Sequence, residues 1–443
     1  MPGGLSTDLY ELNMAASYLR RGMHGLATFS LYVRDMPKQR GFLVAAGLDD
    51  CLRFLESFGF EEDELTYLRR LGFDPRAIED FRDLRFEGDV WAVPEGRIVH
   101  AREPLLEVTA PIAQAQLVEA VLLNQVTVHT TLTSKAARYV IAAEGRALVD
   151  FAFRRAHGIE AARAAARGSA IVGFQATSNV AAASELGLRA TGTMAHSFIT
   201  AFDEEREAFR AFAEDHPHRT TFLVDTYDTL TGVRNAIEVI REVDPPGEVG
   251  VRLDSGDLDR LSREARRALD HAGLGRAKIF ASGGLDEHEV AELVRAGAPV
   301  DAFGIGTQLG VSADAPYVDA VYKLVEFAGR PVLKLSPAKA TAPGRKQVWR
   351  GPSEDMIGLR DEAAPGPNHE PLLEPVMRAG RRLAHAPSIE EMRARFERDL
   401  AALPVKAARL SHPEHVVAHR TEALAALTTE TAEAARRRLR SSD

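Results

Sequence analysis

Glycine pairs and polar side chains follow several short apolar runs in the middle of the chain. Arg252-Leu253-Asp254-Ser255-Gly256-Asp257 ends one run, Ser282-Gly283-Gly284 ends the next, and Gly304-Ile305-Gly306-Thr307 ends the one after. Glycine turns close to a helix start let backbone N–H groups approach a phosphate. One such turn alone would more often serve only as a tight connection. Two on successive runs, beside an Arg/Asp loop, predict a phosphate site.

The segment from Arg252 to Asp257 carries charges that suit a pocket. An unpaired Arg252 within a strand would be expensive, so we expect it to face a carboxylate or a phosphate. Asp254 and Asp257 could hold a metal ion or ribose hydroxyls. Asp257 also fits a helix cap, because it stands just before an expected helix. Asp254 ends an expected strand, where a purely structural role is harder to assign.

A histidine and two arginines follow other runs of the same kind. His196 comes after Gly192-Thr193-Met194-Ala195, at an expected strand end. Spacing alone favours neither a catalytic nor a structural role for it. Arg154 and Arg155 follow the run that ends at Phe151. Either both arginines are surface charges, or one of them faces the anion at the end of a barrel strand.

The apolar runs alternate with helical segments over this whole region. The expected strands are 147–151, 170–173, 221–225, 249–254, 278–281 and 302–306, and the expected helices are near 159–167, 179–185, 230–241, 258–271 and 287–296. Such alternation indicates parallel βαβ units. Six in a row favour a β/α barrel, in which the polar residues gather at the carboxyl ends of the strands. A doubly wound sheet stays open, although no Gly-x-Gly-x-x-Gly follows an early strand.

The flanking regions have a different pattern, rich in short strands. Before the barrel we expect strands at 27–33, 91–93, 97–100 and 105–108, and helices at 48–58 and 112–143. After it we expect strands at 318–327 and 331–335, a polar stretch at 351–371 and helix from 413 onward. A chain of 443 residues is long for one core, so two domains are expected.

Composition narrows the class of protein. Hydrophobic residues make up 45% and charged residues 27%, as in ordinary globular proteins. The net charge of −9, with both signs interspersed, argues against a general nucleic-acid surface but allows a local anion pocket. The single cysteine, Cys51, excludes an internal disulfide and a zinc site built on several cysteines. We therefore expect a cytoplasmic protein, with neither an export signal nor a bilayer-spanning run.

A series of segments, in order over nearly the whole chain, resembles the nicotinate phosphoribosyltransferase family. They are Ser6–Leu12, Phe153–Gly158, Gly192–Ser197, Val224–Asp228, Arg252–Asp257, Ala281–Asp286, Phe303–Thr307, Lys346–Arg350 and Pro371–Met377. The resemblance implies an α/β fold with an incomplete parallel β/α barrel at 126–317. It also implies a smaller α+β sheet domain built from both chain ends, with 1–125 completed by 318–443.

The resemblance also implies roles for individual residues. The family forms homodimers with shared active sites, and the loop Asp8–Tyr10 would reach the neighbouring subunit, where Tyr10 stacks on the pyridine ring. His196 would be the transiently phosphorylated residue. Thr193 and Arg252 would contact nicotinate, and Thr307 would hold the phosphate of phosphoribosyl pyrophosphate, helped by the Gly283-Gly284 turn. Together with the residues at the expected strand ends, this makes His196, Arg252 and Asp254 the catalytic candidates and adds Arg154 and Gly306 to the candidates for substrate binding. His157 replaces the glutamine of the family's usual Arg-Ala-Gln-Gly.

The activity implied is ATP-coupled synthesis of nicotinate mononucleotide from nicotinate and phosphoribosyl pyrophosphate, in NAD biosynthesis. ATP would be a co-substrate, and Mg²⁺ would neutralise the leaving pyrophosphate. Within the same class, a nicotinamide- or quinolinate-using enzyme is the alternative. A sugar-phosphate lyase or isomerase would explain the phosphate turns, but neither His196 nor Tyr10. A non-catalytic regulator would bind phosphoribosyl pyrophosphate without turnover.

Overall fold

The protein was analysed as a computed structural model in which residues 3–335, 341–352 and 354–440 are described. The chain divides into two compact units. We call residues 132–316 the central unit, and residues 1–131 with 317–443 the terminal unit. The division falls at 131/132 and 316/317, where the sequence predicts boundaries at 125/126 and 317/318.

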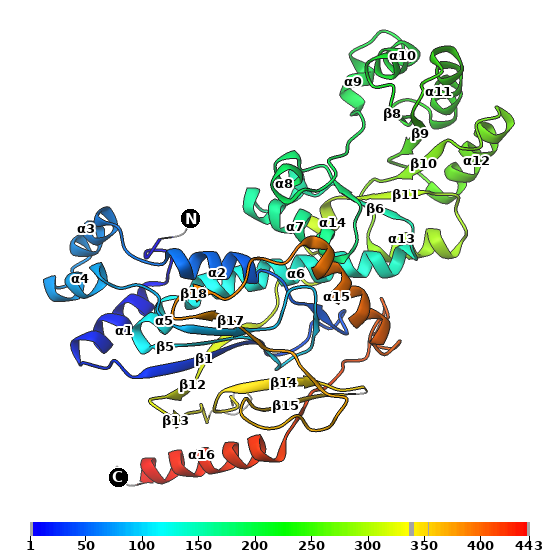
Figure 1. Ribbon diagram of the computed structural model, residues 1–443. Helices are drawn as coiled ribbons and strands as arrows, with labels where there is room; N and C mark the ends of the chain where they lie inside the picture. The colour runs from blue at the N-terminus through cyan, green and yellow to red at the C-terminus, as the bar shows by residue number, and fades with distance from the viewer. Residues whose placement is uncertain (1–2, 336–340, 353, 441–443) are drawn as a thin grey trace. The chain divides into compact units, whose positions relative to one another are not determined.

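The central unit is built on a six-stranded parallel sheet with strand order β7-β6-β11-β10-β9-β8. Its two edge strands do not pair, so the curled sheet is an incomplete barrel, as predicted. Helices alternate with the strands, and α10, α11 and α12 pack side by side (Figure 1). The strands are β6 (Ala147–Asp150), β7 (Ala176–Thr177), β8 (Arg219–Leu223), β9 (Glu248–Leu253), β10 (Lys278–Ala281) and β11 (Ala302–Ile305). The helices are α7 (Ile159–Val172), α8 (Val180–Leu186), α9 (His196–Thr200), α10 (Glu205–Asp215), α11 (Thr229–Val243), α12 (Leu258–His271), α13 (Glu287–Arg295) and α14 (Thr307–Gly310).

Aspartate caps fix where the helices start, and so where each strand-to-helix loop ends. Asp228 accepts from Thr231 N at the start of α11, and Asp257 accepts from Arg260 N at the start of α12. Asp286 forms a capping box with Glu289 at the start of α13. The loops between strand and cap are short, which keeps the strand-end side chains in place.

Two expectations for the central unit are wrong. The predicted strand at 170–173 is the last turn of α7, which ends at Gly173 in the left-handed region (φ 113°). A short buried apolar run looks the same in a strand and in a helix, and here the alanine-rich helix continues through it. His196 does not follow a strand: only Ala190 makes an isolated bridge, with Thr177, and residues 192–195 are loop. In addition, α10 was not predicted.

The terminal unit joins both ends of the chain in one seven-stranded sheet of order β13-β12-β1-β5-β3-β17-β18, as predicted, but it is the larger of the two units and not the smaller one. Its strand β1 lies between β12 and β5, antiparallel to both. The strands of this sheet are β1 (Leu26–Val33), β3 (Asp89–Ala92), β5 (Pro104–Pro111), β12 (Ala320–Phe327), β13 (Arg330–Pro331), β17 (Glu374–Arg378) and β18 (Arg381–Arg382). A four-stranded sheet contains β16 (Glu370–Pro371), β14 (Lys346–Arg350), β15 (Asp355–Leu359) and β19 (His419–Arg420), and a two-stranded sheet contains β2 (Leu43–Val44) and β4 (Ile98–Val99).

Several expected elements of the terminal unit differ in detail. The helix predicted at 112–143 is two helices that meet at Val118, and the second, α6, crosses the boundary between the units. The strand predicted at 331–335 is only β13, and the polar stretch 351–371 contains β15 and β16. The helices are α1 (Leu9–Arg20), α2 (Leu48–Ser57), α3 (Glu62–Arg70), α4 (Pro75–Arg82), α5 (Ile112–Leu117), α6 (Glu119–Ala143), α15 (Ile389–Ala402) and α16 (Glu422–Arg440). None of the described helices is both long and apolar enough to cross a membrane.

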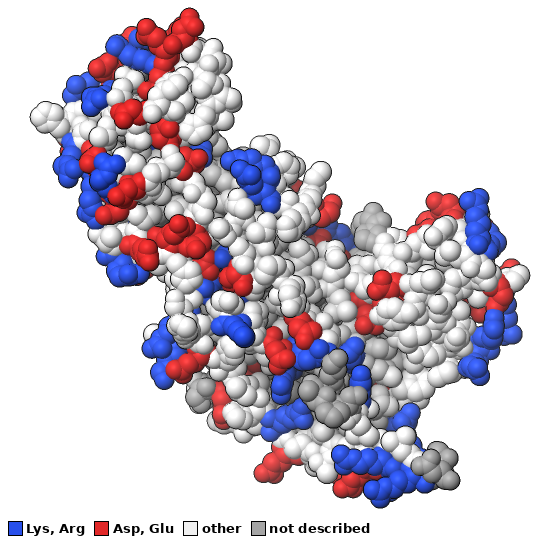
Figure 2. All heavy atoms as spheres, turned by 180° about the vertical axis from the view of Figure 1, so that it is seen from behind, with Lys and Arg blue, Asp and Glu red and all other residues white. Residues whose placement is uncertain are grey.

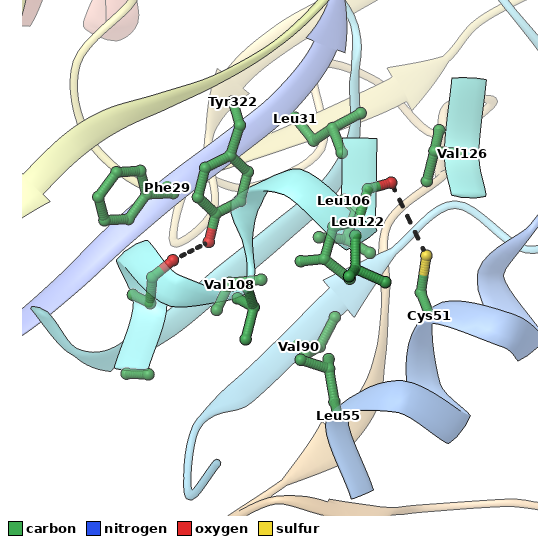
Figure 3. Packing of buried hydrophobic residues seen from close by; sticks show 14 of the residues in the cluster. Phe29, Leu31, Cys51, Leu55, Val90, Leu106, Val108, Leu122, Val126 and Tyr322 are labelled. Atoms are coloured by element: carbon green, nitrogen blue, oxygen red, sulfur yellow. Dashed lines mark hydrogen bonds between the residues drawn. The ribbon is translucent and has the colours of Figure 1, made fainter. Parts of the chain in front are cut away.

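The core of the terminal unit packs side chains from distant parts of the sequence (Figure 3). Tyr322 stacks on Phe29 with ring centroids 4.7 Å apart and donates its hydroxyl to the carbonyl of Ala115 at 2.8 Å. Cys51 is fully buried in this core. The interior therefore holds β1, α5 and β12 in register.

One buried carboxylate links the seven-stranded and the four-stranded sheet of this unit. Glu107 on β5 is fully buried and accepts from the hydroxyl of Ser30. It also pairs with Lys346 on β14, at 3.1 Å, and with Arg360. A buried charge needs such partners, so the C-terminal strands complete the interior of the N-terminal sheet.

On the face shown in Figure 2, acidic and basic side chains are interspersed over most of the surface.

Candidate active site

Arg252 is the centre of the strand-end cluster. It lies near the end of β9, it is buried, and its guanidinium stands over the ring of Phe151 at 5.3 Å. Its Nε donates to Ser282 Oγ at 2.8 Å, Nη1 to Thr193 Oγ1 at 3.2 Å and Nη2 to Asp254 Oδ1 at 2.6 Å. Residues from three loops thus hold one guanidinium in a fixed orientation.

Asp254 is the carboxylate that Arg252 faces. Its Oδ1 also accepts from Ser282 Oγ at 2.5 Å. Burial raises the pKa of Asp254, but the hydrogen bond from Ser282 and the charge of Arg252 outweigh it and hold the pKa below its usual value. The side chain is therefore ionised at neutral pH. Both hydrogen bonds use Oδ1, and among the described residues Oδ2 has no partner, so it can accept from a ligand.

A second carboxylate links the ends of β8 and β9. Asp225 Oδ2 accepts from the N–H of Asp254 at 3.0 Å and from Ser255 Oγ at 2.6 Å. Its Oδ1 is buried and has no hydrogen-bond partner in the described part of the chain. The next residue, Thr226, contacts His196 Nδ1 at 3.1 Å. His196 itself is exposed and is the first residue of α9.

The two glycine turns lie at the ends of the next strands. Gly283 and Gly284 have φ of 104° and 83°, which side-chain-bearing residues rarely adopt. A Cβ on Gly283 would stand 1.7 Å from the carbonyl oxygen of Asp254, so only glycine fits there. Gly306 precedes α14, and Thr307 begins this helix with an exposed side chain. Both turns therefore present backbone that a ligand can approach.

Asp150 organises the end of β6. It is fully buried, and its oxygens accept from the N–H of Ala152 at 2.8 Å and from Thr177 Oγ1 at 2.6 Å. Arg154 follows in a short 3-10 turn, Phe153–Arg155, with its side chain exposed. The carboxyl of Asp150 thus fixes the turn that carries Arg154.

The central unit brings together most of the predicted site residues, but not all of them. Asp257 is taken up by the cap of α12, which is its structural alternative. The described residues contain no group of three or more His, Cys, Asp or Glu side chains that could hold a metal. Tyr10 belongs to the terminal unit, and it lies in the first turn of α1 rather than in a loop, because Asp8 already occupies the N-cap position.

Sequence reasoning did not single out Phe151, Asp225, Thr226 or Ser282. A signal for two of them was present, since Asp225 ends an apolar run just as Asp254 does, and Ser282 directly precedes the glycine pair. What was missing was the pairing of these residues with Arg252 and Asp254, which depends on neighbouring strands.

The central unit is an incomplete β/α barrel, and its strand ends carry a buried arginine paired with a half-buried aspartate, a histidine and two glycine turns. This is the layout of a barrel enzyme for anionic, phosphate-bearing substrates. Comparison with known proteins specifies the family. The N-terminal-domain model of nicotinate phosphoribosyltransferases matches residues 5–127, the family model matches 146–350, and the C-terminal-domain model matches 361–428.

Individual relatives agree with these matches. A nicotinate phosphoribosyltransferase of Mycobacterium tuberculosis is 48% identical over 410 residues, covering 91% of this chain and 88% of the relative. One of Bacillus subtilis is 42% identical, covering 81% and 76%. The crystal structure of human nicotinic acid phosphoribosyltransferase matches with a TM-score of 0.86 at 29% identity, covering 96% of this chain and 99% of that one. The chain belongs to the nicotinate phosphoribosyltransferase family, and it is an enzyme of NAD biosynthesis.

The pKa of Asp150 leads to a prediction about stability. Burial raises it from 3.8 to about 6, although the hydrogen bonds from Thr177 and Ala152 lower it in part. Folding thus favours the neutral carboxyl: its stabilising contribution is complete below pH 3.8 and is lost as the pH rises through about 6. Asp150→Asn stays neutral, so it should gain up to roughly 3 kcal/mol relative to the wild type between pH 4 and pH 7. Urea unfolding across this range measures the difference, and parallel pH profiles for the two proteins would contradict the prediction.

Proposed function

We propose that this enzyme joins nicotinate to phosphoribosyl pyrophosphate, with ATP as co-substrate, to give nicotinate mononucleotide, diphosphate, ADP and phosphate. The observation that carries the choice of base is the environment of Arg252. Its Nη2 faces a carboxylate, whereas within the described part of the chain its Nη1 donates only to the hydroxyl of Thr193. A hydroxyl is a weaker partner for a guanidinium than a carboxylate is. The carboxylate of nicotinate, placed beside Nη1 and Thr193, would supply the stronger partner.

The phosphate groups of the second substrate have a separate place in the proposal. The backbone N–H groups of the Gly283-Gly284 turn and of Gly306-Thr307 would hold them, with exposed Arg154 as a further cation. Breaking the ribose–pyrophosphate bond builds negative charge on the leaving group, and Mg²⁺ would neutralise part of it. Mg²⁺ bound largely by phosphates needs few protein ligands, and Asp254 Oδ2 is an available one. The pyridine nitrogen is the nucleophile, and it needs positioning rather than activation.

The choice of base can be tested directly. With phosphoribosyl pyrophosphate, Mg²⁺ and ATP, we expect kcat/KM for nicotinate to exceed that for nicotinamide by at least about 100-fold, since only nicotinate offers a charged partner to Arg252. Arg252→Lys should lower kcat/KM for nicotinate by about 10- to 100-fold, because a point charge cannot reproduce the guanidinium contacts.

Arg210→Lys is the matched control, because it alters a half-buried arginine that is paired with Glu242 on α11, away from the strand-end cluster. It should leave turnover unchanged. Quinolinate is assayed as a third base. Equal turnover of nicotinate and nicotinamide, or turnover of quinolinate in place of nicotinate, would contradict the proposal.

We assign the ATP-dependent step to His196. An imidazole nitrogen is a good nucleophile. Nδ1 of His196 contacts Thr226, and Nε2 has no hydrogen-bond partner among the residues that the structure describes, so Nε2 can attack. Attack on the γ-phosphorus would release ADP, and water would later hydrolyse the phosphohistidine to phosphate. The added negative charge would attract the nearby cations and order the site around pyrophosphate.

His196→Ala should abolish ATP hydrolysis and the stimulation by ATP, while slow ATP-independent transfer survives. ATPase activity, transfer with and without ATP, and Tm are measured on one preparation. His218→Ala, an exposed histidine just before β8, serves as the control and should keep both activities. If a well-folded His196→Ala protein is stimulated by ATP as strongly as the wild type, the phosphohistidine assignment is wrong.

We further propose a homodimer in which Tyr10 completes the site of the other subunit. Leu9 and Tyr10 are 54% and 48% exposed at the start of α1, which is unusual for adjacent apolar residues. Burial and nearby Glu119 raise the pKa of Tyr10, so its ring stays neutral for stacking.

A cytoplasmic location would suit the single free cysteine, Cys51, and cell fractionation can test it.

Mixed dimers test the shared site. Tyr10→Ala and Arg252→Ala proteins should each be nearly inactive alone. Co-expressed, they should recover about a quarter of wild-type activity, because half of the dimers are mixed and each has one intact site. A fully active monomer in sedimentation, or no recovery in verified mixed dimers, would rule out the arrangement.

A further inference from the structure

Four charged side chains form a buried cluster in the central unit, next to the site but not part of it. Lys135 Nζ and Arg138 Nε, on α6, lie 2.5 and 2.7 Å from the carboxylate oxygens of Glu287, the first residue of α13. The same atoms lie 3.2 and 3.6 Å from the carboxylate of Asp314. None of these side chains is more than 9% exposed. We call these four residues the buried charge cluster.

On one side, the buried charge cluster is linked to the Gly283-Gly284 turn. Glu287 follows the loop that contains Gly283 and Gly284. In the same loop, the carbonyl of Leu285 accepts from the hydroxyl of Tyr139, on α6, at 3.0 Å. The far end of the loop is fixed by Ser282, through its bonds to the arginine–aspartate pair. The glycine turn is therefore anchored on both sides.

On the other side, the buried charge cluster is linked to the Gly306-Thr307 turn. Asp314 lies in the segment that leaves α14, and this segment folds back on the helix. The N–H of Val311 donates to the carbonyl of Thr307 at 3.1 Å, and that of Ala313 to Gln308 at 3.0 Å. A shift of Asp314 would therefore move the start of α14, where Thr307 lies.

The cluster resists displacement because its charges balance. Two cations face two anions, and a buried charge that loses its partner is strongly destabilising. Burial raises the pKa of Glu287, but Lys135 and Arg138 outweigh it and hold the pKa below its usual value, so the carboxylate is ionised. Both glycine turns are thus linked, through Glu287 and Asp314, to the same two side chains of α6, Lys135 and Arg138.

We propose that Lys135 and Arg138 are positioning residues of the phosphoribosyl pyrophosphate site, which hold the Gly283-Gly284 and Gly306-Thr307 turns at the separation that one substrate requires. This rests on the proposed function, because it takes the two turns as the place where the substrate's phosphates bind. Cations that only stabilised the unit would affect all substrates alike, whereas positioning residues affect this substrate selectively.

The test measures the Kd for phosphoribosyl pyrophosphate by calorimetry, the KM for nicotinate, and Tm. Lys135→Met should raise the Kd about 10- to 100-fold, since displacement of binding groups by about 1 Å has effects of that size. The KM for nicotinate should change less than about threefold, because Arg252 lies on β9 and Thr193 in the loop before α9, outside the two glycine turns. The double variant Lys135→Met/Glu287→Gln leaves Arg138 paired with Asp314, so Tm should recover toward the wild type while the Kd stays raised.

Two conservative changes complete the test. Tyr139→Phe removes only the hydroxyl that holds Leu285 and should raise the Kd about threefold, which decides the matter if Lys135→Met does not fold. Thr220→Val is the matched control: it removes a buried hydroxyl that donates to the carbonyl of His216, at the opposite end of β8 from Asp225. Its Kd should equal that of the wild type.

The outcomes distinguish an error in the proposed function from an error in the positioning role. If the wild type does not bind phosphoribosyl pyrophosphate, the proposed function itself is wrong. If the wild type binds it, but the folded cluster variants bind it equally well, only the positioning role is wrong. An increase in Kd for Thr220→Val as large as that for Tyr139→Phe would also overturn the positioning role, because it would show a general response to lost stability.

Discussion

Arg252 and Asp254 face each other across 2.6 Å at the end of β9, and the rest of the central unit is arranged so that this pair can exist there. A guanidinium shielded from water needs partners for its N–H groups, and one carboxylate does not provide enough. Ser282 comes from the next strand and Thr193 from the loop before α9. Each partner therefore requires a neighbouring strand or loop to stop at the right residue, and the capped helices that follow the strands ensure that it does.

The same constraint explains what could be predicted from the sequence. The strands near 221–225, 249–254, 278–281 and 302–306 were found because short apolar runs alternate with helical segments, and each run ends at polar or glycine residues. The run 170–173 lacked such an ending, and only its position in the fold shows that it is helix. The loop before His196 could not be predicted either, since its partners are distant in sequence: Thr193 contacts Arg252, and His196 contacts Thr226. Periodicity identifies elements, but it does not identify partners across strands.

In the terminal unit, segments from both ends of a long chain enclose one interior. Glu107 shows how this is done, because its carboxylate is buried on β5 while its cationic partners come from the C-terminal segments. Neither half could bury this group alone at acceptable cost. The aromatic contact between Phe29 and Tyr322 follows the same pattern with apolar groups. Both interactions make the N- and C-terminal segments depend on each other, while the central unit keeps its own core.

The position of β1 has a consequence for how the chain is made. This strand pairs with β12, so that Leu31 stands opposite Tyr322, a residue that leaves the ribosome long after it. Until then, the N-terminal segment carries an open strand edge and an unfinished apolar face, the features that favour association with other chains. The central unit lies between the two segments and contains all of its own strand partners, including the distant pair β6 and β11. The earliest residues of the polypeptide therefore wait for partners that are made only after the whole central unit.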